Sequence, residues 1–451
     1  MQKLTSLILI FVLGFGAGYQ AFAQQAPKTK VRIKSVKIKH YNFNGGNYER
    51  SMWSGLYCAS NGKVYIGLST HADAAYVYEF DPATEKMTFL ADLSRLAEER
   101  GKGIWTTGKI HVQMQELDGY VYFGALDEDS GPPAIDCSSY QGPHWYRINL
   151  ETSKVEKLSL INSFWGLVGQ AMDAERRLLY GLAENGHLYK YIIDKDISVD
   201  MGRVDDWDIC RTIFMDDVGN VYGSYTPAHI WKYDVLQDRI FDLPFLKLPI
   251  INQPRTMSNP MLDRKGQWRI IEWDPVDKVA YGIVGGSSLL FKYDVHDGEE
   301  GSITSLVEMC APQFREGDPM AIPYATLAMT ISQKERKIYY FPVMTGAFDY
   351  DAVSFDVLDE LKFSEKLAGG RFPPLSYLTV YDLKKGELDD LGILRGMDGR
   401  HVYGLGGAQA DKEGRIWFVG AFEEPNEKFV AGTIQGEFPY SMGLGCYDPF
   451  E

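Results

Sequence analysis

Apolar and polar residues alternate along this chain in a unit that recurs seven times. Each unit has a polar turn followed by a short strand rich in β-branched and aromatic residues. These seven segments are Asn61–Gly67, Asp118–Gly124, Glu175–Gly181, Val218–Ser224, Asp277–Ile283, Glu335–Phe341 and Glu413–Val419. A second strand pattern follows each of them, in Val77–Asp81, Trp145–Asn149, Leu188–Ile192, Ile230–Asp234, Leu290–Asp294, Leu378–Asp382 and Gly443–Asp448. The pattern predicts short strands joined by tight turns.

Two further strands complete each unit. An apolar run precedes each turn, and in the first six units a final strand such as Lys154–Leu160 closes the repeat. A four-stranded unit seen seven times predicts an all-β fold, a seven-bladed β-propeller.

The two ends of the chain are expected to meet. The last repeat stops at Tyr447–Pro449, where its fourth strand should begin, and Lys30–Lys39 alternates charged and apolar residues like an edge strand. We expect this N-terminal strand to complete the last blade, which would cover an exposed sheet edge. The alternative is a free basic arm.

The first 23 residues have the pattern of a secretory signal peptide. Lys3 gives a positive start, Leu7–Leu13 is apolar, and Ala21–Ala23 is a small-residue cleavage site. The sequence therefore predicts export to the periplasm or outside the cell, with residues 24–451 forming a single propeller domain. The apolar run is too short to span a membrane comfortably, so no membrane span is expected.

Four stretches are longer than the repeat requires: residues 126–143, 296–324, 342–376 and 421–442. Long insertions on a repeat scaffold often shape a binding site, although they can equally be surface decoration.

The net charge of −15 argues against binding a nucleic-acid backbone over a broad surface. It does not exclude a local basic pocket. No motif requires a cofactor, and the acidic run Asp127–Asp129 leaves room for a structural divalent metal such as calcium.

Three basic residues share one position in the repeat. His111, Arg211 and Arg269 each stand eight positions before the turn residue that follows the first strand. First strands line the centre of a propeller, so these side chains are expected to converge at one end of it. They would form a pocket for a carboxylate or sulfate, which arginine can grip through two hydrogen bonds. The alternative is internal ion pairing with Asp208, Asp216, Asp217 or Glu272.

A second shared position lies just before the third strand and is occupied by His144, His187 and His229. These histidines either bind substrate or form framework hydrogen bonds. His144 stands apart, because its blade also carries His111, and the two could exchange protons across one end of the blade. Tyr225 follows the second strand of blade 4, on the side expected for Arg211. It is a second candidate proton donor or acceptor, although most tyrosines here fill strands.

Several segments resemble a known group of proteins. They are Gly108–His111, Asp118–Gly124, Gly142–Arg147 and Arg211–Tyr222. They are similar to exported seven-bladed propellers that degrade acidic polysaccharides, namely the propeller ulvan lyases and the related propellers that cleave rhamnose–glucuronic acid linkages. The resemblance implies β-elimination of a uronic acid by histidine, tyrosine and arginine, and His111, His144 and Arg211 match that set. The loop Leu182–His187 lacks the tyrosine that the resemblance implies there.

The chemistry is consistent with this resemblance. Arg211 and Arg269 would neutralise the uronate carboxylate, and His111 or His144, with Tyr225 as second candidate, would remove the proton beside it. Arg269, His187 and His229 would bind the substrate. The sequence thus predicts an exported polysaccharide lyase whose partner is an acidic polysaccharide or oligosaccharide. The alternatives are a non-catalytic glycan- or protein-binding propeller, or a glycosidase acting on a sugar linked to glucuronic acid.

Overall fold

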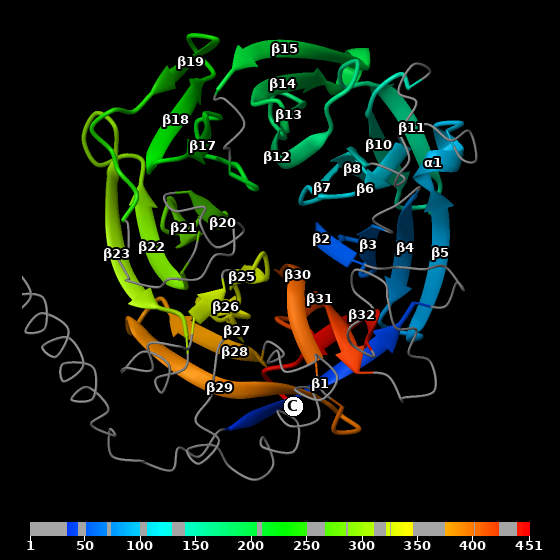
Figure 1. Cartoon of the computed structure of the whole chain (residues 1–451), viewed down its shortest axis with the longest axis vertical. Helices are drawn as coiled ribbons and strands as arrows, with labels where there is room; N and C mark the ends of the chain where they lie inside the picture. Colours follow the sequence, from blue (N-terminus) through cyan, green and yellow to red (C-terminus); the bar gives the residue numbers. More distant parts are fainter. Residues whose placement is uncertain are drawn as a thin grey trace, which may run out of the picture.

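In a computed structural model of the chain, strands surround a central axis (Figure 1). The structure describes residues 34–43, 51–69, 74–99, 106–128, 140–204, 210–249, 267–285, 287–310, 322–324, 326–345, 375–400, 402–423 and 440–451. The predicted signal peptide lies outside these residues. So do the central parts of the four predicted insertions, at 129–139, 311–321, 346–374 and 424–439.

Five separate four-stranded antiparallel sheets form consecutive blades. Blade 1 contains β2 (Ser51–Cys58), β3 (Val64–Ser69), β4 (Ala75–Asp81) and β5 (Lys86–Asp92). Blade 2 contains β7 (Gln115–Leu117), β8 (Tyr120–Gly124), β10 (His144–Asn149) and β11 (Val155–Leu160). Blade 3 contains β12 (Leu167–Asp173), β13 (Leu178–Ala183), β14 (His187–Ile192) and β15 (Ile197–Arg203). Blade 4 contains β16 (Phe214–Met215), β17 (Val221–Tyr225), β18 (His229–Asp234) and β19 (Arg239–Asp242). Blade 5 contains β20 (Trp268–Asp274), β21 (Val279–Val284), β22 (Leu289–Asp294) and β23 (Ser302–Glu308).

The remaining part of the ring is a ten-stranded sheet. Its strands are β1 (Ser35–Asn42), β24 (Ile322–Tyr324), β25 (Met329–Ser332), β26 (Lys337–Tyr340), β27 (Val343–Thr345), β28 (Leu375–Asp382), β29 (Glu387–Gly396), β30 (Val402–Ala410), β31 (Ile416–Glu423) and β32 (Tyr440–Tyr447). A small ribbon of β6 (Thr106–Lys109) and β9 (Leu126–Glu128) accompanies blade 2, and two short helices, α1 (Leu93–Leu96) and η1 (Ile193–Lys195), complete the described elements. The predicted β-propeller with four-stranded blades is confirmed.

Tight turns link the strands as the repeat pattern predicts. Between β7 and β8 the turn has only two central residues, Asp118 and Gly119, with φ of 50° and 76°. Two positive φ angles match the hairpin turn whose twist agrees with that of the flanking strands, and glycine adopts such an angle without strain.

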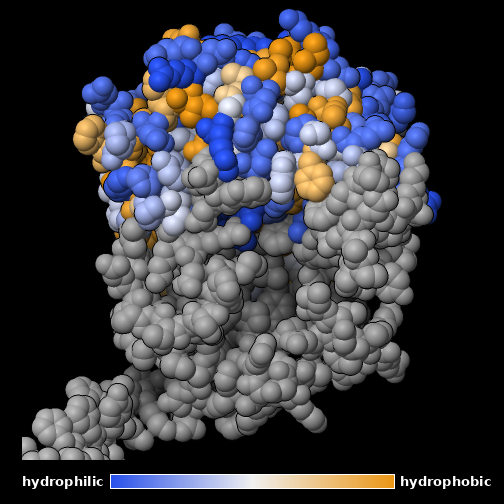
Figure 2. All heavy atoms as spheres, turned by 45° about the horizontal axis from the view of Figure 1, so that its top comes forward, coloured by the Kyte–Doolittle hydropathy of each residue, from blue (hydrophilic) through white to orange (hydrophobic). Residues whose placement is uncertain are grey.

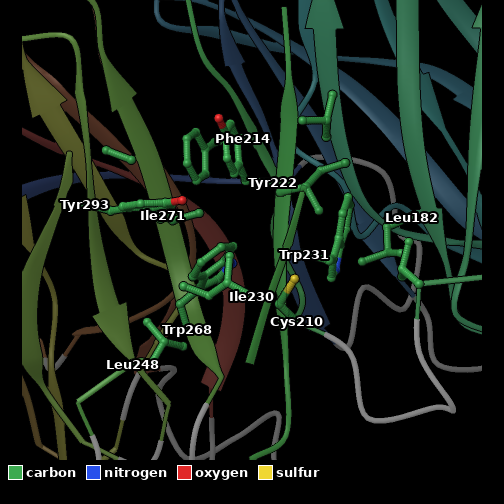
Figure 3. Packing of buried hydrophobic residues seen from close by; sticks show 14 of the residues in the cluster. Leu182, Cys210, Phe214, Tyr222, Ile230, Trp231, Leu248, Trp268, Ile271 and Tyr293 are labelled. Carbon is green, nitrogen blue, oxygen red and sulfur yellow. The ribbon is translucent and has the colours of Figure 1, made fainter. Parts of the chain in front are cut away.

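Aromatic residues pack closely within blade 4. In Figure 3 the rings of Phe214 and Tyr222 lie side by side, with centroids 4.9 Å apart and planes at 9°. Trp231 lies over Gly223, where an added Cβ would come within 2.2 Å of the indole. The glycine in the second strand of this repeat is therefore required by the ring that packs on it.

The N-terminal strand β1 is divided between two partners. Residues Ser35–Ile38 pair in parallel with Ile393–Gly396 of β29, and residues Lys39–Asn42 pair antiparallel with Gly443–Cys446 of β32. Ile38, at the change of partner, is fully buried. The C-terminus lies beside β1 in Figure 1, so the first and last strands of the described chain are neighbours.

The innermost strands leave backbone N–H groups without a strand partner, and side chains from adjacent blades accept some of these. Gln409 Oε1 accepts from Cys58 N at 2.6 Å, and Glu272 Oε2 accepts from Ile331 N at 3.2 Å. Burial raises the pKa of the Glu272 carboxyl to about 8. Neighbouring blades are thus joined by polar contacts near the axis as well as by their apolar faces.

The outer rim is mixed in polarity. Figure 2 brings forward the rim of blades 3 and 4, where apolar residues are interspersed with hydrophilic ones. Ile197 and Val199 on β15 and Leu236 in the turn after β18 are exposed. Isolated apolar side chains of this kind are normal on protein surfaces.

Replacing Ile38 with alanine should weaken the closure made by β1. Loss of a fully buried side chain is expected to lower the free energy of unfolding by about 2–5 kcal/mol, measured by urea denaturation. Lys37→Ala on the exposed side of β1 is the control and should change it by less than about 0.5 kcal/mol. Equal effects of the two substitutions would contradict the buried role of Ile38.

Replacing Glu272 with glutamine should raise stability at alkaline pH. The folded-state pKa of about 8 lies above the ordinary 4.5. The contribution of this carboxyl to the free energy of unfolding is therefore complete below pH 4.5 and is lost as pH rises towards 8. Glutamine keeps an acceptor for Ile331 N and cannot ionise. The melting temperature of Glu272→Gln should therefore exceed that of the wild type at pH 8 and match it near pH 4.5. The exposed Glu175→Gln should leave the pH profile unchanged, and an unchanged profile for Glu272→Gln would refute the assignment.

Candidate functional site

The candidate site lies where the innermost strands start. His111 precedes β7, Arg211 precedes β16, and Arg269 is the second residue of β20. Figure 1 shows β7 and β20 next to the central axis. The group formed by His111, Arg211 and Arg269 is called the basic cluster below.

The imidazole of His111 is held in one orientation. Its side chain is buried, and Nδ1 lies 2.9 Å from the carbonyl oxygen of Val168 on β12 of blade 3. A carbonyl oxygen only accepts hydrogen bonds, so Nδ1 carries the hydrogen and Nε2 holds the lone pair. This tautomer makes Nε2 a proton acceptor.

The same part of β12 also lies beside Arg211. A Cβ added to Gly169 would lie 3.5 Å from the Arg211 carbonyl oxygen. The indole of Trp268, which precedes Arg269, donates to the carbonyl oxygen of Thr212 at 2.7 Å. Contacts between backbones and fixed side chains therefore tie the starts of the three strands together.

The electrostatics agree with this proximity. Desolvation lowers the pKa of His111 well below its ordinary value, and the charges of Arg211, Arg269 and Lys109 lower it further. The hydrogen bond with Val168 acts in the opposite direction. His111 is therefore neutral at physiological pH and lies within reach of the charges of both guanidinium groups.

One carboxylate lies against the cluster. Glu184 Oε1 is 3.7 Å from Arg211 Nη1, with the two side chains 33% and 21% exposed. The backbone N–H of Glu184 donates to Gly166 O at 3.0 Å, which fixes the start of the β13–β14 loop. The repeat register predicts neither Glu184 nor Lys109, two residues before His111, as a site residue. Both residues stand in segments that the resemblance had already marked.

The acidic residues expected to pair with the arginines have other described roles. Asp217 pairs with Lys278 at 2.9 Å and His296 at 2.9 Å, and Glu272 accepts from Ile331 N. Asp216 accepts three backbone N–H bonds in its own turn. Asp208 lies outside the described residues.

His144 packs beside an aromatic ring of its own strand. It is buried at the start of β10, and its ring lies edge-on to that of Tyr146, at 6.4 Å between centroids. The next residue, Trp145, stacks on Tyr191 of blade 3. The pairing of His144 with His111 across one end of the blade stays a prediction.

The environment of His144 also differs. Burial, followed by the charge of Lys157, lowers the pKa of His144 to about 4. Neither arginine of the basic cluster is among the causes.

Tyr225 reaches toward the outer rim of blade 4. Its hydroxyl donates to Asp242 Oδ1 on β19 at 2.9 Å, and its ring stacks on His229 at 4.9 Å. His229 Nδ1 lies 2.8 Å from Lys247 Nζ, and an ammonium only donates, so this nitrogen is an acceptor. These contacts tie Tyr225 to the outer strand of its own blade and His229 to Tyr225 and Lys247.

His187 makes the corresponding contact in blade 3. Its Nδ1 lies 2.9 Å from Asp200 Oδ2 on the outermost strand β15. His144, His187 and His229 each begin the third strand of their blade, as the repeat register predicts. The contacts of His187 and His229 fit the framework interpretation of this position.

The opposite end of the ring contains a cavity of about 460 Å³ between the first turns of blades 1 and 2 and the β30–β31 turn. Its carboxylates are already engaged: Glu116 accepts from Ser60 N at 2.8 Å and Asp411 from Arg415 Nε at 2.8 Å. The cavity lining also includes Lys63 and Lys412.

Among the described residues, no group of three or more His, Cys, Asp or Glu side chains is placed to hold a metal ion. Within the same ranges, no helix has the length and apolarity needed to cross a membrane.

Comparison with known proteins supports the fold alone. No family model matches the chain, and no curated protein matches it. Among solved structures, the RRP9 WD40 repeats give a TM-score of 0.50 at 6% identity, covering 92% of this chain and 99% of that one. A chain of a mitotic checkpoint complex gives 0.48 at 10% identity, covering 95% and 98%, and the Dos1 propeller gives 0.41 at 12%, covering 65% of this chain and 66% of its own. The chain is thus a β-propeller, and its activity must be argued from its own residues.

Replacing His144 with glutamine should reduce the sensitivity of the fold to acid. The pKa of His144 is about 4 in the folded state against an ordinary 6.5, so the unfolded chain takes up the proton first as pH falls. The wild type should lose about 3 kcal/mol between pH 6.5 and 4 from this group, and His144→Gln should not. Denaturant unfolding across this range is the measurement. Lys157→Gln should give a partial effect, and equal pH slopes for all three proteins would refute the prediction.

Proposed function

We propose that this protein is an exported seven-bladed propeller that binds a uronate-containing polysaccharide at the basic cluster and cleaves it by β-elimination. The observation that carries the proposal is a buried, neutral His111, with Nε2 as acceptor, beside Arg211 and Arg269.

The count of seven blades depends on how the ten-stranded sheet is divided. Strands β25, β26, β28 and β29 pair in sequence, and so do β30, β31, β32 and β1. Taken as two blades joined by β1, they agree with the seven repeats of the sequence. Export is inferred from the pattern of residues 1–23.

The arginines supply what proton removal from a uronate requires. The proton beside a carboxylate is weakly acidic until the carboxylate charge is neutralised. Arg211 can neutralise the negative charge that develops there, and Arg269 can bind the same group as part of the substrate site.

His111 can then serve as the base. Its Nε2 takes the proton from C5 of the uronate, the C–H electron pair forms the C4–C5 double bond, and the C4–O bond breaks. The same proton passes from His111 to the leaving oxygen, so protons and electrons balance. The substrate carboxylate offsets the two guanidinium charges and thereby favours protonation of His111. This scheme uses no cofactor and needs neither His144 nor Tyr225.

The second candidate is a non-catalytic glycan-binding propeller. It is supported by the contacts of the predicted proton-transfer residues: His111 has a described contact near the cluster, whereas the described contacts of His144 and Tyr225 lie within their own blades. Binding requires only the two arginines.

Incubation with ulvan, arabinogalactan and pectic glycans should separate the two candidates. The lyase is expected to produce an unsaturated uronate, measured by its ultraviolet absorbance. His111→Gln should reduce the rate about 100-fold or more with glycan binding retained, and Arg211→Gln should weaken both binding and rate. His187→Gln, on the outer rim, is the matched control and should retain the wild-type rate. If the protein binds uronate polymers but forms no unsaturated product from any of them, the lyase is refuted and only the non-catalytic binding role remains.

A further inference from the structure

We propose that Glu184 is a specificity-determining residue: its carboxylate occupies the position beside Arg211 that a ligand carboxylate takes, so it competes with weakly anionic ligands. This inference rests on the proposed binding of a carboxylate at the basic cluster. Beyond that proposal, it assigns Glu184 as an anion of the protein that competes with the ligand for Arg211.

The geometry shows a loose ion pair. The separation of 3.7 Å between Glu184 Oε1 and Arg211 Nη1 exceeds the usual length of a charge-assisted hydrogen bond. Tighter pairs occur elsewhere in the molecule, such as Arg336 and Asp274 at 2.6 Å, where the carboxylate is fully buried. The Arg211–Glu184 pair has instead the length and partial exposure of a contact that a better ligand can replace.

The backbone of Glu184 is held while its side chain remains partly exposed. Its N–H donates to Gly166 O, and the next turn is closed by Gly186 N donating to Ala183 O at 2.9 Å. The carboxylate can therefore leave Arg211 by side-chain rotation, without remodelling of the β13–β14 loop.

Glu184 can compete with ligand anions because it carries a negative charge beside several positive ones. The charges of Lys109, Arg211 and Arg269 all act on His111, and the carboxylate of Glu184 lies within ion-pair distance of Arg211. A ligand carboxylate that binds Arg211 from this side must therefore displace the negative charge of Glu184. A carboxylate that also reaches Arg269, or a ligand with several anionic groups, gains enough binding free energy to displace Glu184. A ligand with a single weakly held anionic group does not.

The test compares two charge-matched variants. Glu184→Gln and Glu175→Gln each remove one negative charge from blade 3, and Glu175 is an exposed residue of the β12–β13 turn. Binding of glucuronate, as the free monoanion, is measured by calorimetry at fixed ionic strength, with thermal melting to confirm folding. Glu184→Gln should bind about threefold to tenfold more tightly than the wild type, and Glu175→Gln should match the wild type.

Three outcomes contradict the inference. Unchanged or weaker binding by Glu184→Gln would show that Glu184 does not compete and would assign it to positioning Arg211. An equal gain in glucuronate affinity in both variants would show that the effect comes from the net charge of the protein and not from the position of Glu184. Absence of binding in every variant would remove both the inference and the proposed site. Tighter binding by Glu184→Gln together with no unsaturated product would leave the inference standing and remove only the lyase activity.

Discussion

The pairing of β1 with two different strands is the constraint on which the ring depends. β29 and β32 would each present unpaired N–H and C=O groups if β1 were absent, and such edges recruit other chains. By joining in parallel to one and antiparallel to the other, a single strand covers both edges. The distances between the starts of the inner strands, and therefore the grouping of His111, Arg211 and Arg269, follow from a ring of fixed circumference.

Much of the fold could be predicted from the sequence because the repeat is strongly periodic. The turn at Asp118–Gly119 and the start of the third strand at His144, His187 and His229 lie where the pattern places them. Glycines such as Gly223 recur because a neighbouring ring needs the space. The N-terminal strand was expected from its alternation, but its division between two sheets was not, since alternation alone does not identify the partner.

The candidate site was less predictable because side-chain direction depends on local register. Register shifts occur between His144 and Tyr146 in β10 and between Trp268 and Ile270 in β20, at the positions where the candidate residues stand. A shift of one residue moves a side chain from one face of the sheet to the other. The number of residues between a candidate and the next turn therefore gives its position along the strand but not the face to which its side chain points. Contacts with β12 and Thr212 link the strand starts that carry His111, Arg211 and Arg269. His144 and Tyr225 have described contacts within their own blades.

The pairing of β1 with both β29 and β32 also affects the order in which parts of the molecule fold. The residues of β1 stand far before their partner Gly443–Cys446 in the sequence. Pairing across almost the whole chain carries a large loop-closure entropy and makes the final step slow compared with the formation of each hairpin. Blades 1 to 5 can form from local contacts, while β1 waits as an unpaired strand. The ring therefore stays open until β1 pairs with β32, and its closure is a late step.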